Sequence, residues 1–133
     1  MHEDLTEIAQ GCLDAAFAGT MDFPTIVGTL IAAEFEGYDV DYRRGTSTFF
    51  RADGATVQLE MQALAAPVAA MFNATDIERA VREAQTRAPG YTYAGFNAKV
   101  QAAGCAGYMV SFLGKRVVYF GRTAETHVER FPQ

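Results

Sequence analysis

Two stretches of the chain place apolar residues at the spacing of an amphipathic helix. The first covers residues 4–18, where Gly19 ends the pattern. The second begins at Thr75 and Glu78, which have the form of a capping box, and is stopped by Pro89 and Gly90. The pattern therefore predicts one amphipathic helix near the start of each half of the chain.

A second helix is predicted to follow each of these. Asp22 is a capping residue, and the helix after it is expected to run to about Phe35. Thr92 stands in the corresponding place in the second half. Gly37 and Gly107 come directly after the two helices, and we expect each glycine to close its helix in the left-handed conformation.

Alternation of apolar and polar side chains predicts three strands after each pair of helices. Asp53 and Gly54 form a strong hairpin signal that favours a two-residue turn with positive φ angles, and the second half lacks this pair. The predicted strands cover residues 38–43, 47–51, 55–61, 108–113, 117–121 and 126–130.

The two halves also share residues at an offset of 70 positions. At two of these positions one aromatic residue replaces another: Tyr42/Phe112 and Phe49/Tyr119. We therefore predict an α+β fold built by internal duplication of a helix-helix-three-strand unit, at about 4–61 and 75–131. The antiparallel meanders would be related by a pseudo-twofold, with helices packed on one six-stranded sheet or on two facing sheets. Six positions between 32 and 50 are identical to their counterparts: Ala32/Ala102, Ala33/Ala103, Gly37/Gly107, Tyr38/Tyr108, Val40/Val110 and Phe50/Phe120.

Neither half is expected to be stable alone, because three strands and two helices make a thin core. We therefore expect residues 1–133 to form a single domain. The segment 62–74 between the repeats is too apolar for a plain linker, and it is expected to pack as a short helix or a covering loop broken at Pro67.

Composition and charge narrow the possible partners. No apolar run approaches the ~18–20 residues of a membrane span, and the acidic start does not resemble a signal peptide, so a cytoplasmic protein is expected. Residues 1–74 carry three basic and eleven acidic side chains, whereas residues 75–133 carry eight and five. The net charge of −5 argues against nucleic-acid binding. This charge asymmetry would favour attraction between the two halves of one chain or between two copies of the protein. The alternative is that it reflects only random sequence variation on solvent-exposed faces. Both a monomer and a homodimer are consistent with it.

Three runs, AGCAGY at 103–108, VVYFGR at 117–122 and HVERFP at 127–132, resemble the bacterial DUF1398 family. Some members are encoded in prophages, and some are labelled phage envelope proteins. The resemblance spans most of the chain and is strongest from about Gln85 to Pro132. It implies a duplicated α+β fold and, in a prophage setting, a host-modulating or accessory role, and it implies no catalytic residues.

The cysteines and histidines are few. Cys12 and Cys105 do not occupy matching positions in the repeat, so two reduced, buried thiols are expected and no disulfide. Cys105 is a candidate nucleophile, but it lies near a predicted helix C-terminus, whose partial negative charge opposes thiolate formation, and a core role is favoured. Two histidines leave too few ligands for a metal site, and no cofactor is expected.

His127 lies two residues before Glu129 in the last predicted strand, so the two side chains share a face. The pair could act as a general base and its orienting carboxylate. The favoured alternative is a half-exposed histidine at a sheet edge beside a solvated glutamate.

The aromatic pairs of the repeat, Tyr38 with Tyr108 and Tyr42 with Phe112, could line a groove for a small apolar or aromatic ligand. Their alternation favours a place in the core instead. Basic side chains near the predicted first turns and second strands, Arg44 and Arg122 among them, could hold a carboxylate or phosphate, although a solvated rim is favoured. This set is Arg43, Arg44, Arg51, Lys115, Arg116 and Arg122.

Three functions remain, in this order. The first is a non-enzymatic module that binds a small molecule or a protein in a groove between the repeats, which predicts a cavity lined by aromatic residues from both. The second is a small enzyme, which requires His127 to face a concave site with Glu129 within hydrogen-bond reach. The third is a self-associating structural or accessory protein, whose mass should depend on concentration and salt.

Overall fold

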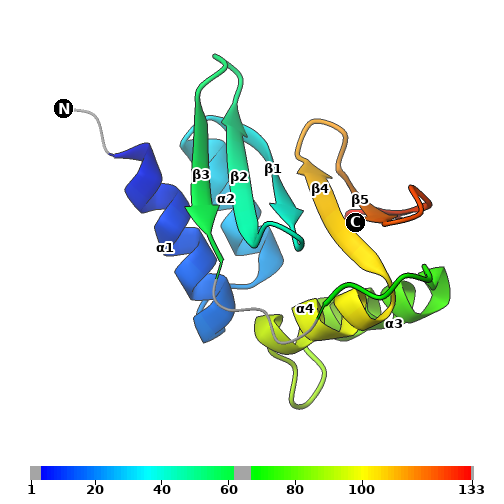
Figure 1. Ribbon diagram of the computed structural model, residues 1–133. Helices are drawn as coiled ribbons and strands as arrows, with labels where there is room; N and C mark the ends of the chain where they lie inside the picture. Colours follow the sequence, from blue (N-terminus) through cyan, green and yellow to red (C-terminus); the bar gives the residue numbers. More distant parts are fainter. Residues whose placement is uncertain (1–3, 62–66, 133) are drawn as a thin grey trace.

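The computed structural model describes residues 4–61 and 67–132. In both halves two helices are followed by three strands, as predicted (Figure 1). The elements are α1 (Leu5–Ala18), α2 (Phe23–Ala32), β1 (Phe35–Asp41), β2 (Thr46–Arg51), β3 (Thr56–Glu60), α3 (Ala74–Thr86), α4 (Tyr93–Ala102), β4 (Cys105–Ser111), β5 (Arg116–Gly121) and β6 (Thr126–Arg130).

The described strands form one six-stranded antiparallel sheet in the order β3-β2-β1-β4-β5-β6. The fold is therefore α+β, as expected, and the alternative of two facing sheets is wrong. The meanders join where β1 pairs with β4, and the middle of this pairing sets Asp39 opposite Met109. These two residues stand at the same place in the two halves of the sequence, 70 positions apart.

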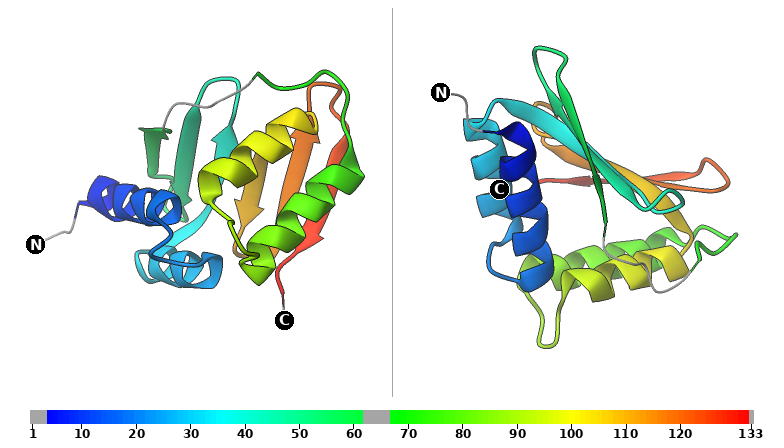
Figure 2. Two further views of the ribbon diagram at one scale, coloured as in Figure 1. Left: turned by 90° about the horizontal axis from the view of Figure 1, so that it is seen from below. Right: turned by 60° about the vertical axis from the view of Figure 1, so that its left-hand side comes forward.

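The four helices lie on one side of the sheet, as two pairs (Figure 2). α1 contacts α2, and α3 contacts α4, while α1 and α4 join the two pairs. Because side chains alternate along a strand, every strand turns one set toward the helices and the other set away from them. The inner set includes Val40, Phe49, Leu59, Val110 and Val117, all buried in the core.

Capping residues begin the helices. The side chain of Asp22 accepts a hydrogen bond from the backbone N–H of Thr25, and Thr92 caps α4 in the same way, as predicted. The predicted cap of α3 is wrong by two residues. Its N-cap is Asn73, and Thr75 lies inside the first turn.

The helices that precede β1 and β4 end earlier than the sequence indicated. The residues in the left-handed conformation after them are Glu34, with φ 69°, and Gly104, with φ 89°. The prediction that Gly37 and Gly107 close the helices is therefore wrong. Because the chain turns sooner, each strand begins three residues before the predicted start.

Gly37 and Gly107 lie inside β1 and β4, where the backbones approach closely. A Cβ atom at Gly37 would stand 2.4 Å from the carbonyl oxygen of Val110, and one at Gly107 would stand 2.4 Å from that of Val40. Both distances are far inside van der Waals contact. The identity of these positions in the two halves therefore has a packing cause at the centre of the sheet.

The first hairpin differs from its prediction. Four residues, 52–55, separate β2 from β3, and of these only Gly54 has a positive φ, so the two-residue turn is wrong. Asp53 still shapes the turn, because its carboxylate accepts the backbone N–H of Ala55.

Residues 67–73 form a covering loop, which was one of the two alternatives for the segment 62–74; residues 62–66 lie outside the described part of the chain. The loop runs beside the end of α4. The backbone N–H of Ala69 donates to the carbonyl of Gln101 at 3.0 Å, and that of Asn73 donates to the carbonyl of Ala103 at 2.7 Å.

Candidate functional site

A cavity of about 150 Å³ lies between the inner face of the sheet and the helices. All four helices and five of the strands contribute to its wall, β3 being the exception. The wall is mainly apolar and aromatic, and we call this space the tyrosine cavity. Its tyrosines are Tyr38, Tyr91, Tyr93, Tyr108 and Tyr119.

The wall draws on the same positions in the two halves. Tyr38 and Tyr108, which the sequence analysis named as candidate ligand-binding residues, both line the cavity. Six pairs of lining residues stand 70 positions apart: Met21 and Tyr91, Phe23 and Tyr93, Ile26 and Phe96, Tyr38 and Tyr108, Ser47 and Val117, and Phe49 and Tyr119.

Tyrosine hydroxyls are among the polar groups of the cavity. The hydroxyl oxygens of Tyr93 and Tyr108 lie 2.6 Å apart and share a hydrogen bond. The ring of Tyr38 lies edge-on to that of Tyr108, with centroids 6.4 Å apart. Burial raises the pKa of Tyr93 to about 12 and raises the pKa values of Tyr38, Tyr108 and Tyr119 well above the ordinary value. These hydroxyls are therefore neutral hydrogen-bond donors at physiological pH.

Tyr42 and Phe112, the other aromatic pair, lie in the core and do not line the cavity. The hydroxyl of Tyr42 donates to Asn97 Oδ1 at 2.6 Å, which joins the end of β1 to α4. Both side chains are buried, so this bond is made inside the protein. The core alternative describes Tyr42 and Phe112 better than a groove does.

His127 and Glu129 do meet, as the sequence analysis required. His127 Nε2 and Glu129 Oε2 are 2.6 Å apart, on the face of β6 that turns toward the helices. Glu129 is buried and lines the tyrosine cavity, whereas His127 does not line it. The solvated-edge alternative is wrong for Glu129, because its carboxylate is held between His127 and Arg82 of α3.

Arg82 is the positively charged residue beside His127 and Glu129. Its Nη1 lies 3.0 Å from Glu129 Oε1, and its Nη2 lies 3.5 Å from Glu78. The hydrogen bond to Glu129 raises the pKa of Arg82. Glu78, His127 and Glu129 place ligand atoms within 4.8 Å of one another, but a metal ion there would have to displace the guanidinium. The prediction of no metal stays a prediction.

Cys105 is buried at the start of β4, and its thiol donates to the carbonyl of Gly107 at 3.1 Å. Burial raises its pKa to about 12, which opposes thiolate formation more strongly than the expected helix end would. Cys12 is also buried and free, and it lines the tyrosine cavity. Both cysteines are thus reduced core residues.

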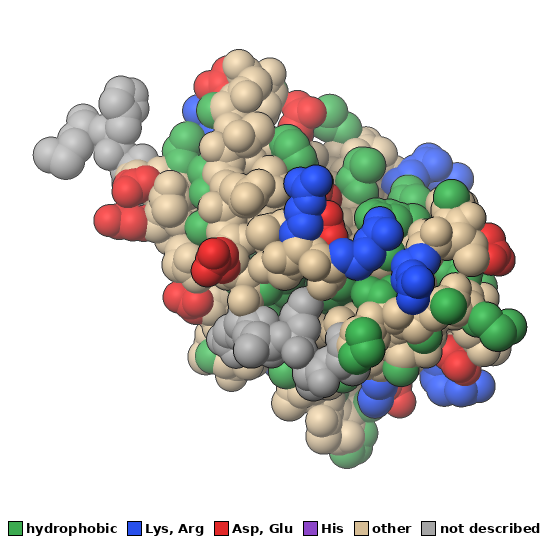
Figure 3. All heavy atoms as spheres, in the orientation of Figure 1, with side chains coloured by type: hydrophobic (Ala, Val, Ile, Leu, Met, Phe, Trp, Pro, Cys, Tyr) green, Lys and Arg blue, Asp and Glu red, His purple; other side chains and the backbone are tan. Residues whose placement is uncertain are grey.

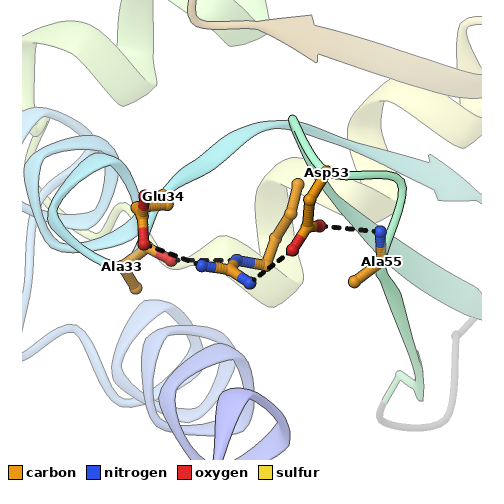
Figure 4. A network of polar contacts seen from close by, with 5 residues as sticks. Ala33, Glu34, Asp53 and Ala55 are labelled. Carbon is orange, nitrogen blue, oxygen red and sulfur yellow. Dashed lines mark hydrogen bonds and ion pairs between the residues drawn. The ribbon is translucent and has the colours of Figure 1, made fainter.

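The basic side chains do not form one anion site. Arg51 bridges Glu34 and Asp53 at 2.9 Å each and donates to the carbonyl of Ala33 (Figure 4). Arg44 is exposed and stands 3.7 Å from Asp41. Arg122 donates to the carbonyl of Val68 in the covering loop. None of these three arginines lines the tyrosine cavity.

The sequence analysis missed Tyr93, Phe96 and Tyr119 as lining residues. A signal for them existed, because each stands 70 positions after an apolar residue that also lines the cavity. The pair Phe49 and Tyr119 was already among the matched aromatic positions, and extending the comparison of the halves back to Phe23 would have added Tyr93 and Phe96.

The fold and site define a small α+β protein with an aromatic cavity between a sheet and two helix pairs. The chain belongs to the DUF1398 family, a family of proteins of unknown function whose model matches residues 16–129. This confirms the resemblance of the three C-terminal runs. No curated protein matches the chain. Within the described residues, no helix is long and apolar enough to cross a membrane.

Proposed function

We propose that this protein is a non-enzymatic binding protein that holds a small organic molecule in the tyrosine cavity. The observation that carries the proposal is the wall of the cavity, which is apolar and aromatic and is drawn from both halves of the chain. Ligand sites are usually concave, mainly apolar, and equipped with a few convergent polar groups. The hydroxyls of Tyr93 and Tyr108 are such groups. The cytoplasmic location that accompanies this proposal rests on the sequence alone.

Two features favour binding over acid–base catalysis. The histidine of the candidate pair, His127, is not part of the wall of the tyrosine cavity, so it could not act on a molecule bound there. The carboxylate of Glu129 does reach the wall, but it already accepts from Arg82 and contacts His127. A general base needs a free lone pair within hydrogen-bond reach of its substrate.

We also infer that the cavity is the product of an internal duplication with pseudo-twofold symmetry. The matched lining pairs support this inference, as does the pairing of Asp39 with Met109 at the centre of the sheet. Positive φ angles recur at the same offset: Glu34 and Gly104, Gly45 and Lys115, Gly54 and Ala124. A duplicated unit folded around a dyad would enclose one shared cavity without any local binding motif.

Native mass spectrometry of freshly purified protein, compared with its denatured mass, tests the proposal. A discrete excess mass that disappears on denaturation is the expected result. Ala84→Leu places a larger side chain in the cavity wall and should abolish the excess mass. Ala94→Leu, at an exposed position of α4, is the matched control and should retain it. An excess mass that persists in Ala84→Leu would place the ligand elsewhere.

The outer face of the sheet supports a second candidate, self-association. By strand alternation, Asp39, Asp41 and Glu60 face outward in one half, and Arg116 and Arg130 do so in the other. Figure 3 shows basic side chains gathered on one side of the molecule, with hydrophobic ones among them, and mainly acidic ones at the opposite edge. A twofold axis parallel to the strands would set the acidic half of one copy over the basic half of another.

Analytical ultracentrifugation tests this second candidate. We expect a dimer at low salt that dissociates as salt is added, because exposed charges are screened over about 10 Å at 0.1 M ionic strength. Arg116→Glu should weaken the dimer, whereas Arg79→Glu, on the exposed side of α3, should not. A monomer at every salt concentration would exclude this candidate and leave the tyrosine cavity unaffected.

A further inference from the structure

The volume of the tyrosine cavity limits what it can hold. At about 150 Å³ it is smaller than the roughly 300–1,000 Å³ of pockets for drug-sized ligands. An apolar cavity of about 150 Å³ holds one benzene molecule. The occupant is therefore the size of a single six-membered ring with a small substituent.

The charges around the cavity limit the occupant further. Glu129 is the acidic residue of the wall, and Arg82 and His127 already contact its carboxylate. Arg130 follows Glu129 in β6, so its side chain projects from the opposite face of the sheet. Arg87 stands at the end of α3, where its guanidinium donates to the carbonyl of Gly19 and lies 5.8 Å from the ring centroid of Tyr91. The charged groups of Glu129 and Arg87 thus already have contacts within the protein, and burying a charged ligand there would be costly.

The hydroxyl pair provides polar recognition. A tyrosine hydroxyl has one proton and two acceptor sites. Tyr93 and Tyr108 share one hydrogen bond, which uses one of their two protons whichever of them donates. The other proton is not used in this bond, the side chains of Tyr38 and Asn97 are the further polar neighbours of the two hydroxyls, and both rings border the cavity. An oxygen atom on the ligand can take this proton.

We propose that the ligand class is an uncharged, single-ring aromatic molecule bearing one oxygen substituent, whose oxygen accepts a hydrogen bond from the Tyr93–Tyr108 pair. This inference rests on the proposed binding function and specifies its ligand. The aromatic wall stacks with the ring, and the hydroxyl pair sets its orientation. Burial keeps both tyrosines protonated, so the donor is available throughout the physiological pH range.

Isothermal titration calorimetry with three single-ring probes tests the class: phenol, toluene of the same size, and the slightly larger anion benzoate. We expect phenol to bind about two- to tenfold more tightly than toluene, the gain of one neutral hydrogen bond. Benzoate should bind more weakly than either. Protein that native mass spectrometry shows to be free of small molecules is used for every titration.

The double variant Tyr93→Phe/Tyr108→Phe removes both hydroxyls of the pair while keeping both rings. It should abolish the preference for phenol over toluene and leave toluene binding unchanged, whereas either single variant still leaves one hydroxyl proton and should retain the preference. Circular dichroism checks that the double variant is folded, and the comparison of probes on the unmodified protein decides the question if it is not.

The outcomes separate the two proposals. Equal binding of phenol and toluene would overturn the oxygen requirement while leaving the cavity as a binding site. Tighter binding of benzoate than of phenol would overturn the inference of an uncharged ligand and point to Arg87. If none of the three probes binds, the ligand class fails, and the excess mass seen by native mass spectrometry decides the proposed function separately.

Discussion

The buried hydrogen bond between Tyr42 and Asn97 offers a direct test of how the two halves are related. Tyr42 ends up beside α4 of the other half, and its hydroxyl lies 2.6 Å from Asn97 Oδ1. The counterparts of this pair, 70 positions away in sequence, are Phe112 and Val27. The counterpart positions thus hold two apolar residues where this pair, which joins the two halves, has two polar partners.

The expected cost follows from the burial of both side chains. Tyr42 is 5% exposed and Asn97 is 1% exposed, so neither can turn to water when its partner is removed. Tyr42→Phe leaves Asn97 Oδ1 without this donor, and Asn97→Val leaves the hydroxyl without this acceptor, each costing about 1–3 kcal/mol. Replacing both partners by apolar groups can be nearly neutral. The double variant should therefore cost less than the sum of the single variants by about 2 kcal/mol.

Urea denaturation of the four proteins measures the free energies of unfolding for this cycle. Tyr91→Phe is the control, because the hydroxyl of Tyr91 makes no hydrogen bond within the described residues, and it should change stability little. Additive effects of the two single variants would refute the reasoning. So would a double variant that is less stable than either single variant.

Three other predictions concern the sheet, the thiols and the tyrosines. Gly107→Ala should lower the free energy of unfolding by about 2–4 kcal/mol, because the new methyl group must separate β1 from β4. The control Gly11→Ala, exposed in α1 with open space around it, should raise the free energy of unfolding by about 1 kcal/mol. Equal thermal midpoints for the two variants would contradict the close approach of the strands. Thiol reagents at pH 8 should label Cys105 only after unfolding, because its pKa is raised to about 12, and rapid labelling of the native protein would contradict its burial. The buried tyrosines have pKa values raised above the unfolded value of about 10. Their contribution to stability is therefore complete below pH ~10 and is lost as the pH rises through the folded pKa values. Phenolate absorbance should appear together with alkaline unfolding, and its appearance well before unfolding would contradict this prediction.

The candidate site was only partly predictable from the sequence. Tyr38 and Tyr108 could be named because they are identical in the two halves, and both line the cavity. Tyr42 and Phe112 follow the same repeat, yet they lie in the core. Two residues that share the face of a strand can sit under a helix or beside a gap between helices, and the strand pattern does not distinguish these cases.

The His127–Glu129 pair shows the same division. Their spacing on a strand was sufficient to place the two side chains on one face. Their third partner, Arg82, comes from α3, 47 positions earlier, and only the packing of that helix on β6 brings it to 3.0 Å from the carboxylate. With Arg82 in place, the pair joins a helix to an edge strand.

By itself, the sequence determined the α+β class, the order of the helices and strands, and the caps at Asp22 and Thr92, because these depend on neighbours within a few positions. It also contained identities 70 positions apart, on which the proposed duplication rests. The tertiary structure decided the single sheet, the strand order and the tyrosine cavity. These depend on contacts such as β1 with β4, whose strength is set by the fit of surfaces far apart along the chain and not by local periodicity.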